Sequence, residues 1–153
     1  MIASFKMNKI LFPLIALLFL STSCVGILGF EEEPDEADAF VGTYSISASA
    51  HVVWGRASYS YTDRGTLYIY KVSATTIRTS GFFSTTGRVI NNYIYFDPDY
   101  SSDAEGYINE VYGPGMLTGS LLTFSSNGTG QIRYNGVVEP WSRSSHYTAT
   151  KLR

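Results

Sequence analysis

Side chains that could carry acid–base or metal chemistry are few and scattered in this chain of 153 residues. The only two histidines are His51 and His146. A metal site or a proton-transfer centre normally draws on several such side chains. The sequence also lacks the Gly-x-Ser-x-Gly turn that presents the nucleophilic serine of many hydrolases. We therefore expect no catalytic residue, no cofactor and no enzymatic activity, with an uncharacterised hydrolase as the one exception left open.

One cluster of carboxylates could hold a metal ion. Asp97, Asp99 and Ser101 are spaced like the first ligands of a calcium-binding loop. The pattern then fails, because Ser102 stands at the position of the glycine and Ile108 at the position of the bidentate glutamate. A solvated loop between strands is the favoured interpretation, and a calcium site of another kind is the alternative. The candidate ligands of that alternative are Asp97, Asp99, Asp103 and Glu105.

Tyrosines are abundant, with twelve in the chain, and several recur at the two-residue spacing of a strand. Each of three pairs, among them Tyr59 and Tyr61, would place both rings on one face of a strand. Cross-strand packing is one explanation, since aromatic pairs stabilise a sheet by about 0.2–1 kcal/mol each. The functional alternative is an exposed aromatic platform for sugar rings or an apolar ligand. The best candidates, which oppose the predicted core face, are Tyr68, Tyr70, Tyr93 and Tyr95.

Strands must position these side chains, because the composition favours β-structure. The chain is rich in Tyr, Phe, Thr, Ser, Val and Ile, and fourteen glycines interrupt it. We find no helical periodicity beyond the N-terminal segment. The clearest strand covers residues 40–54, where mainly apolar positions alternate with mostly polar ones. Its length predicts a bend or a bulge near the Ala-Ser stretch.

Two predicted hairpins repeat one pattern, in residues 89–96 and 117–124. Asn91-Asn92 suits a type I′ turn and Gly119-Ser120 a type II′ turn. Further strands are expected at residues 65–72, 76–84, 106–112, 130–134 and 141–152. This set predicts an all-β fold, an antiparallel up-and-down barrel of about 8–10 strands, with a two-sheet β-sandwich as the alternative. The barrel floor and core should contain Gly42, Tyr44, Trp54, Leu67, Ile69, Phe83, Ile94, Phe96, Leu122 and Phe124.

The segment 39–153 resembles the small lipocalin-like, or calycin-like, β-barrel domains of bacterial lipoproteins. The resemblance rests on Phe40-Val-Gly-Thr-Tyr44, on the hairpin from Gly115 to Phe124, and on the final Ala149-Thr-Lys-Leu152. Lipocalins open with Gly-x-Trp, whose Trp closes the barrel floor against a late arginine. Tyr replaces that Trp here, and Arg143 could be the late arginine. The resemblance implies a barrel able to enclose a small apolar ligand, although a fold alone does not assign a function.

The first 23 residues have the pattern of an export signal. Lys6 and Lys9 precede an apolar run over residues 10–20, which is too short to span a bilayer. Small residues follow, and the chain's only cysteine, Cys24, comes directly after them. This order resembles the lipobox of bacterial lipoproteins, and an ordinary buried thiol is the alternative. The resemblance implies a signal peptide at residues 1–23 and lipid on Cys24 that anchors the protein to a membrane.

An acidic tether is expected between the cysteine and the folded domain, in residues 24–38. Glu31 to Asp38 holds six of the thirteen acids and no base, which is typical of a solvated segment. It could be a plain spacer, or it could resemble the surface-export signal of some Gram-negative anaerobes. Val25 is not the aspartate that resembles an inner-membrane retention signal. We therefore expect a cell-envelope protein, with the outer membrane favoured and surface exposure left open.

Two functions remain after charge is considered. Basic residues beyond Asp38 are scattered, which argues against nucleic acid as a partner. In the first function, a non-catalytic barrel binds a small apolar or amphipathic ligand, which requires an interior cavity of about 300 Å³ or more. In the second, a cell-surface module contacts glycan or protein through an aromatic sheet face. The sequence leaves the ligand and the oligomeric state undecided.

Overall fold

The computed structural model describes residues 35–153, which form an all-β fold with one short 3-10 helix, η1 (Glu36–Ala39). Its ten strands form one antiparallel sheet, which confirms the predicted fold class and strand number. The strands are β1 (Gly42–Trp54), β2 (Ala57–Ser73), β3 (Thr76–Gly81), β4 (Thr86–Ile90), β5 (Tyr93–Phe96), β6 (Asp99–Asp103), β7 (Gly106–Tyr112), β8 (Gly115–Thr118), β9 (Leu121–Tyr134) and β10 (Val137–Lys151).

Eight of these strands close into a ring. The order is β10-β1-β2-β3-β4-β5-β8-β9, and β9 pairs back with β10. The first residues of β9 pair with β8, whereas Ser126–Ile132 pairs with β7, which carries β6 at its other side. Strands that are adjacent in the ring follow one another along the chain, apart from the inserted β6–β7 hairpin. The architecture is therefore an up-and-down barrel.

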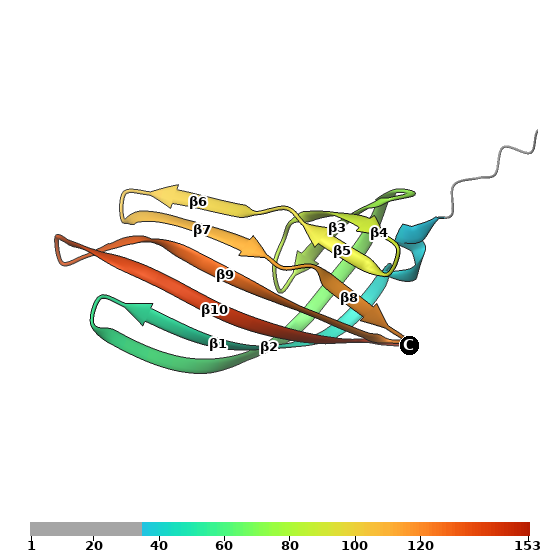
Figure 1. Cartoon of the computed structure of the whole chain (residues 1–153), viewed down its shortest axis with the longest axis horizontal. Helices are drawn as coiled ribbons and strands as arrows, with labels where there is room; N and C mark the ends of the chain where they lie inside the picture. Colours follow the sequence, from blue (N-terminus) through green and yellow to red (C-terminus); the bar gives the residue numbers. More distant parts are fainter. Residues whose placement is uncertain (1–34) are drawn as a thin grey trace, which may run out of the picture. The chain divides into compact units, whose positions relative to one another are not determined.

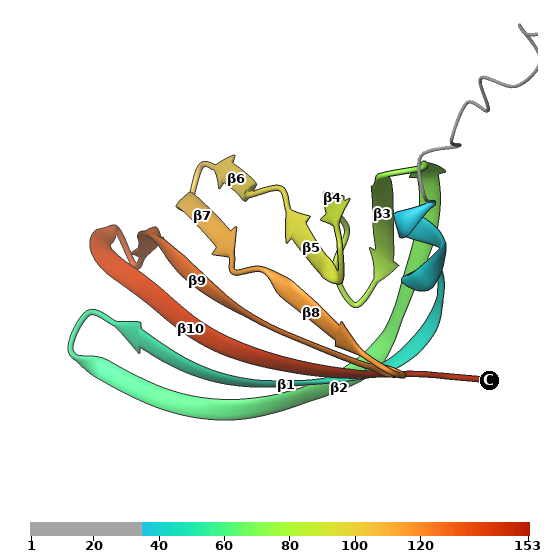
Figure 2. The same ribbon diagram turned by 45° about the vertical axis from the view of Figure 1, so that its right-hand side comes forward.

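The ring is closed over only one part of its long strands. β2 pairs with β1 from Ala57 onward, but with β3 only from Leu67 onward. One side of the first half of β2 and the outer side of β6 therefore have no strand partner among residues 35–153. We call the fully ringed part, next to η1, the closed barrel, and the part built from residues 50–64, 99–112 and 126–145 the open trough. The turns of the three trough hairpins lie at the end away from η1 (Figures 1 and 2).

Inward positions of the closed barrel form the core. Seven of the residues expected there are buried: Tyr44, Leu67, Ile69, Ile94, Phe96, Leu122 and Phe124. Phe83 and Gly42 are half-buried, and Phe83 packs against the core from the segment between β3 and β4. Trp54 is not a core residue, which corrects the prediction. It ends β1 in the open trough, where it packs edge-on against Tyr134 with 5.4 Å between ring centroids.

The two hairpins that the sequence predicts are present as β4–β5 and β8–β9. Asn91 has a φ of 56° and Gly119 a φ of 61°, so both turns use the left-handed region that asparagine and glycine tolerate. The expected irregularity in β1 is absent, because its register with β2 and with β10 is continuous. The register shift lies instead in β2, between Lys71 and Ser73.

The carboxylate segment after β5 is a strand and not the solvated loop that was favoured. Residues Asp99–Asp103 form β6, which pairs with β7 from Asp99 opposite Glu110 to Asp103 opposite Gly106. The sequence pattern missed this strand because all five side chains are exposed. A strand with no buried face shows no apolar alternation.

The floor of the closed barrel is sealed by η1 and the chain that follows it. Phe40 is fully buried, and the Tyr44 hydroxyl donates a hydrogen bond of 2.7 Å to its carbonyl oxygen. The Lys151 ammonium lies 6.0 Å from the centre of the Tyr44 ring and donates to the Ala39 carbonyl. The cation against the floor aromatic is therefore Lys151. Arg143, the residue proposed for this role, lies in the open trough instead.

Part of the predicted acidic tether folds against the barrel. Lys71 contacts the carboxylates of Asp35 and Asp38, and the Asn91 N–H donates to the Glu36 carboxylate at 2.9 Å. Residues 35–38 are therefore docked on the barrel, although Asp35 and Asp38 stay exposed to solvent. Opposite charges and a turn N–H on the barrel account for the docking.

Other predictions fall on residues that the structure does not describe. These are the signal peptide at residues 1–23, lipidation of Cys24, and the acidic residues Glu31 to Glu33. They stay predictions. Within residues 35–153, the structure contains no helix with the length and apolar character needed to cross a membrane.

Candidate functional site

Aromatic rings fill the closed barrel beneath the open trough. Phe124 and Tyr147 stack with 4.4 Å between centroids and 8° between planes. Phe83 lies within 5.6 Å of Phe96, Tyr112 and Phe124, measured between centroids. These rings occupy the space that a deep ligand cavity would need. A ligand site must therefore lie above them.

A cavity of about 140 Å³ lies at the base of the open trough, directly above this aromatic layer. Small side chains make room for it, because Ala48, Ala50 and Ser145 are the inward residues of β1 and β10 at this level. Its volume is below the roughly 300 Å³ of a pocket that encloses a small molecule. The cavity can therefore hold one end of a ligand. Its other lining residues are Tyr61, Asp63, Phe82, Phe83, Tyr112, Arg143 and Tyr147.

A buried polar network crosses the wall of the trough beside this cavity. Glu110 is only 6% exposed and accepts a hydrogen bond of 2.5 Å from the Ser126 hydroxyl. The Tyr147 hydroxyl lies 3.1 Å from Ser126 Oγ and 3.4 Å from Glu110 Oε1. Burial is the main cause that raises the pKa of Tyr147, which keeps it a neutral donor. Arg143 completes the network through an ion pair with Glu110.

Arg143 has one donor that the network does not use. Its Nε is buried and has no hydrogen-bond partner among the described residues. The guanidinium lies 5.7 Å from the centre of the Trp141 ring, as in a cation–π contact. Burial lowers the pKa of Arg143, but the charge of Glu110 and the contacts with Tyr61 and Tyr147 together more than offset it, so the pKa is raised and Arg143 stays cationic. The cavity is therefore lined by a cation that has one N–H group without a partner among the described residues.

The trough wall above the cavity is aromatic on its inner face. The two tryptophans of the chain, Trp54 and Trp141, are register partners on β1 and β10, and both are partly exposed. A Cβ atom at Gly128 would lie 2.8 Å from the Trp141 ring, so this glycine lets the indole lie against β9. On β2, Tyr59 and Tyr61 share the inward phase of Leu67 and keep exposed rings.

Sequence reasoning missed this wall and its network. Glu110, Ser126 and Arg143 look like isolated polar residues on strands that run mostly polar. The one available signal was phase: Tyr59 and Tyr61 are an even number of residues from Leu67, so they belong to its face. The pairing of β10 with β9 and β9 with β7, which brings the polar residues together, is not visible locally.

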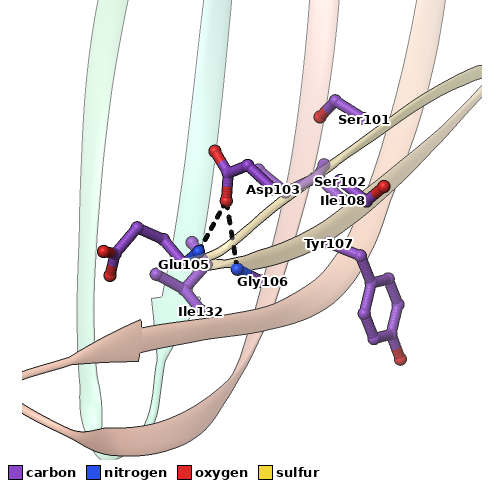
Figure 3. Close-up of a pocket in the computed structure, with 8 residues that line it drawn as sticks. All are labelled: Ser101, Ser102, Asp103, Glu105, Gly106, Tyr107, Ile108 and Ile132. Atoms are coloured by element: carbon purple, nitrogen blue, oxygen red, sulfur yellow. Dashed lines mark hydrogen bonds between the residues drawn. The ribbon is translucent and has the colours of Figure 1, made fainter.

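A second pocket, of about 160 Å³, lies at the tip of the β6–β7 hairpin (Figure 3). The Asp103 carboxylate there accepts hydrogen bonds from the backbone N–H groups of Glu105 and Gly106, at 2.8 and 3.1 Å (Figure 3). Asp97 accepts from the Thr86 hydroxyl. Within residues 35–153, no group of three or more His, Cys, Asp or Glu side chains is arranged to hold a metal ion. We take the trough cavity as the candidate site because it brings a cation together with aromatic rings.

The histidines and the four candidate tyrosines lie outside the barrel. His51 and His146 are on the outer face of β1 and β10, and the His51 ring is 3.0 Å from Ser60 Oγ. The tyrosines of the predicted platform also face outward, on β2 and β5, with 39–52% of each residue exposed. They are Tyr68, Tyr70, Tyr93 and Tyr95. Both histidines and all four candidate tyrosines are thus on the opposite face of the sheet from the trough cavity.

Comparisons with known proteins add little to this picture. No known protein family and no curated protein matches the sequence. A solved S-type phycobiliprotein lyase from Guillardia theta is 8% identical, with a TM-score of 0.35 over 81% of this chain and 98% of that one. A protein of unknown function of the DUF3598 family from Nostoc punctiforme is 14% identical, with a TM-score of 0.35 over 76% of this chain. This chain spans 49% of that second protein.

One of these findings corrects the expectation that the chain is not an enzyme. A solved structure similar to the chain carries the name of a lyase. At 8% identity, the likeness does not assign a lyase activity to this chain. Membership in a lipocalin-like family likewise stays a prediction.

Proposed function

We propose that the protein is an exported, lipid-anchored binding protein whose open trough takes a small amphipathic ligand. The observation that carries the proposal is the cavity of about 140 Å³ lined by the cation of Arg143, whose buried Nε has no hydrogen-bond partner among the described residues. A polar group with an acceptor oxygen fits there, because a charge-assisted hydrogen bond forms most strongly to a carboxylate or a similar anion.

The trough wall accounts for the apolar part of the ligand. The cavity is too small for a whole ligand, but Trp54, Trp141 and Tyr59 are inward residues of the trough, and Trp141 contacts Arg143 of the cavity lining. Aromatic side chains supply large apolar contact areas at binding sites. A ligand with its polar end at Arg143 and its apolar body along these rings would satisfy both parts of the site.

The anchor is supported by the sequence alone. An apolar export segment leads directly into Cys24, the only cysteine of the chain. Lipid on this residue would hold the trough near a membrane surface, where amphipathic molecules concentrate. A Cys24→Ser variant should leave the membrane fraction in the native host while its barrel stays folded. A variant that stays membrane-bound with unchanged processing contradicts the anchor, and leaves the binding proposal standing.

Binding can be tested with two probes that differ only in the polar group. Anilinonaphthalene sulfonate has an aromatic body and a sulfonate, and N-phenylnaphthylamine has the same body without it. The full chain is placed in phosphatidylcholine nanodiscs, and energy transfer from Trp54 and Trp141 reports bound probe, because the chain has no other tryptophan. We expect the sulfonate probe to bind at least about tenfold more tightly, owing to the charge-assisted bond.

The matched variant removes both charges of the network together. A Glu110→Gln/Arg143→Gln double variant avoids a buried unpaired charge, and it should abolish the preference for the sulfonate probe. Arg56→Gln, an exposed arginine in the β1–β2 turn, is the control and should change nothing. Equal affinities for both probes in the unmodified chain, or an unaltered preference in the double variant, would overturn the proposed site.

A further inference from the structure

A second surface, on the outside of the closed barrel, combines tyrosine rings with arginines. Strands β2 to β5 present it, and we call it the tyrosine–arginine face. All of its members are exposed: Tyr68, Tyr70, Arg78, Arg88, Tyr93 and Tyr95. The inward residues of the same strands, such as Leu67 and Ile94, are fully buried. Strand alternation therefore assigns this face entirely to the outside of the closed barrel.

The register of the sheet interleaves rings and cations across four strands. Tyr70 on β2 is the partner of Arg78 on β3, and Arg88 on β4 is the partner of Tyr95 on β5. Arg78 and Arg88 are diagonal neighbours on adjacent strands, because Arg78 is paired with Thr86 and Arg88 with Thr76, each two residues from the other arginine's partner. Neighbouring strands are about 4.8 Å apart, so the row from β2 to β5 spans about 15 Å. Across the four strands, the order of side chains is therefore a tyrosine, two arginines and a tyrosine.

The two arginines are not used by the fold. The ion pairs among residues 35–153 involve Lys71 and Arg143, and neither Arg78 nor Arg88. Asp97, directly after β5, accepts a hydrogen bond from the hydroxyl of Thr86, which is the register partner of Arg78. Two adjacent cations without ion pairs repel each other, so the face lowers its energy by binding negative charge.

Sheet stabilisation does not account for the tyrosines either. Tyr68 and Tyr70 stack on each other along one strand, with 6.4 Å between centroids and 19° between planes. Their cross-strand partners on β3 are Ser80 and Arg78, so no aromatic ring packs against them from that strand. Tyr68 is 39% exposed and Tyr70 is 52% exposed. Flat, exposed rings of this kind suit stacking against the apolar face of a sugar.

We propose that the tyrosine–arginine face binds an anionic polysaccharide. Arg78 and Arg88 would pair with carboxylate or sulfate groups through their planar guanidinium forks, and the flanking tyrosines would stack on sugar rings. The strand spacing of about 4.8 Å is close to the length of one sugar unit, so successive strands can meet successive sugars. The hydroxyls of Thr76, Ser80 and Thr86 between the rings favour a polar polymer over an apolar lipid interior. This surface is independent of the trough cavity.

The test compares a charged polymer with its neutral parent. The full chain in phosphatidylcholine nanodiscs is titrated with dextran sulfate and with dextran, and binding is followed by biolayer interferometry at several salt concentrations. We expect binding to dextran sulfate that weakens with salt, and at least about tenfold weaker binding to dextran. Arg78→Gln/Arg88→Gln should lower the affinity for dextran sulfate about tenfold or more. Tyr70→Ala should lower it severalfold.

Matched controls separate this face from general attraction of a polyanion. Arg56→Gln/Arg133→Gln removes two other exposed arginines, and Tyr100→Ala removes an exposed tyrosine that also stacks within a pair. Both should bind like the unmodified chain. Losses in these controls equal to those in the Arg78/Arg88 variant would overturn the proposal, as would no binding to dextran sulfate. It would also fail if the face bound only vesicles with phosphatidylglycerol, since a membrane would then be the partner.

Discussion

The closed barrel and the open trough are built from the same long strands, yet their inward positions carry different side chains. Along β10, the inward residues of the closed barrel are Ala149 and Tyr147, both buried, and those of the trough are Arg143 and Trp141, both partly exposed. Along β2, Leu67 is fully buried, while Tyr59 is 52% exposed in the same phase. Closure of the ring, rather than strand phase, sets this difference.

The comparison shows how one sheet can separate stability from binding. Where β3, β4 and β5 complete the ring, inward side chains meet others from across the barrel and pack into a core. Where β2 has no second neighbour, inward side chains face a half-open space and can meet a ligand. Polar groups are tolerated at the base of the trough because Glu110 is paired with Ser126, Tyr147 and Arg143, although Arg143 Nε stays without a partner among the described residues.

The largest expected contrast comes from removing one aromatic ring in each region. Phe124→Ala opens a cavity in the closed barrel and should lower the free energy of unfolding by about 3–5 kcal/mol. Tyr59→Ala in the trough should lower it by no more than about 0.5 kcal/mol, because its ring is largely exposed. Urea denaturation measures both. Similar losses in the two variants would mean that the regions do not differ in their contribution to stability.

Breaking the polar network should have the next largest effect. Arg143→Met leaves the buried Glu110 carboxylate without its cation and should lower the free energy of unfolding by about 1–3 kcal/mol. The effect stays below that of a fully buried pair, because the Arg143 side chain is 26% exposed. Glu110→Gln/Arg143→Met should recover part of the loss in urea denaturation. If Glu110→Gln/Arg143→Met were less stable than Arg143→Met, the ion pair would not be the main interaction between Glu110 and Arg143.

Gly128→Ala probes the trough wall without touching a polar group. The added Cβ would lie 2.8 Å from the Trp141 ring, so the indole must move away from β9. We expect a loss of about 1–2 kcal/mol, since crowding is eased by movement into the trough. The emission of tryptophan should also shift to longer wavelength. Unchanged emission would show that Trp141 does not rest on Gly128.

The smallest expected effect concerns the floor of the closed barrel. Burial raises the pKa of Tyr44 to about 12, against about 10 in an unfolded chain. The folded state therefore keeps the proton longer, so stability is full below about pH 10 and falls as the pH rises to about 12. Tyr44→Phe should cost about 1 kcal/mol at neutral pH through its lost hydrogen bond to Phe40.

Tyr44→Phe should also make the free energy of unfolding fall less steeply between about pH 10 and about pH 12. Tyr100→Phe, which changes an exposed tyrosine of the β6–β7 hairpin, should leave that loss unaltered. Thermal unfolding at a series of pH values compares the two variants. An alkaline loss that is as steep in Tyr44→Phe as in the unmodified chain would show that other buried tyrosines cause it.

Much of the fold could be predicted from alternation and turn chemistry. Leu67, Ile69, Ile94, Phe96 and the other apolar residues in strand phase identify the inward face, because side-chain direction alternates strictly along a strand. Asn91 and Gly119 mark the two tight turns through their tolerance of positive φ. The strand β6 could not be found in this way, since a strand that buries neither face leaves no apolar period.

The candidate site could not be predicted, because it depends on distant pairings. Glu110 and Arg143 are 33 residues apart and meet only because β7 and β10 both pair with β9. Trp54 looked like a core residue because it shares the phase of Tyr44. The missing ring closure around the end of β1 leaves it partly exposed, and no local pattern reports that.

By itself, the sequence determined the class of the fold, the inward face of most strands and the turns between them, since these follow from local periodicity and backbone preference. It also predicts the export signal and the anchor at Cys24, because both follow from the order of residues in one short segment. Only the tertiary structure decided which inward residues are buried, where the polar groups meet, and that cations and rings interleave on one outer face. Those outcomes depend on strand register and on how far the ring closes, which are set between segments far apart in the chain.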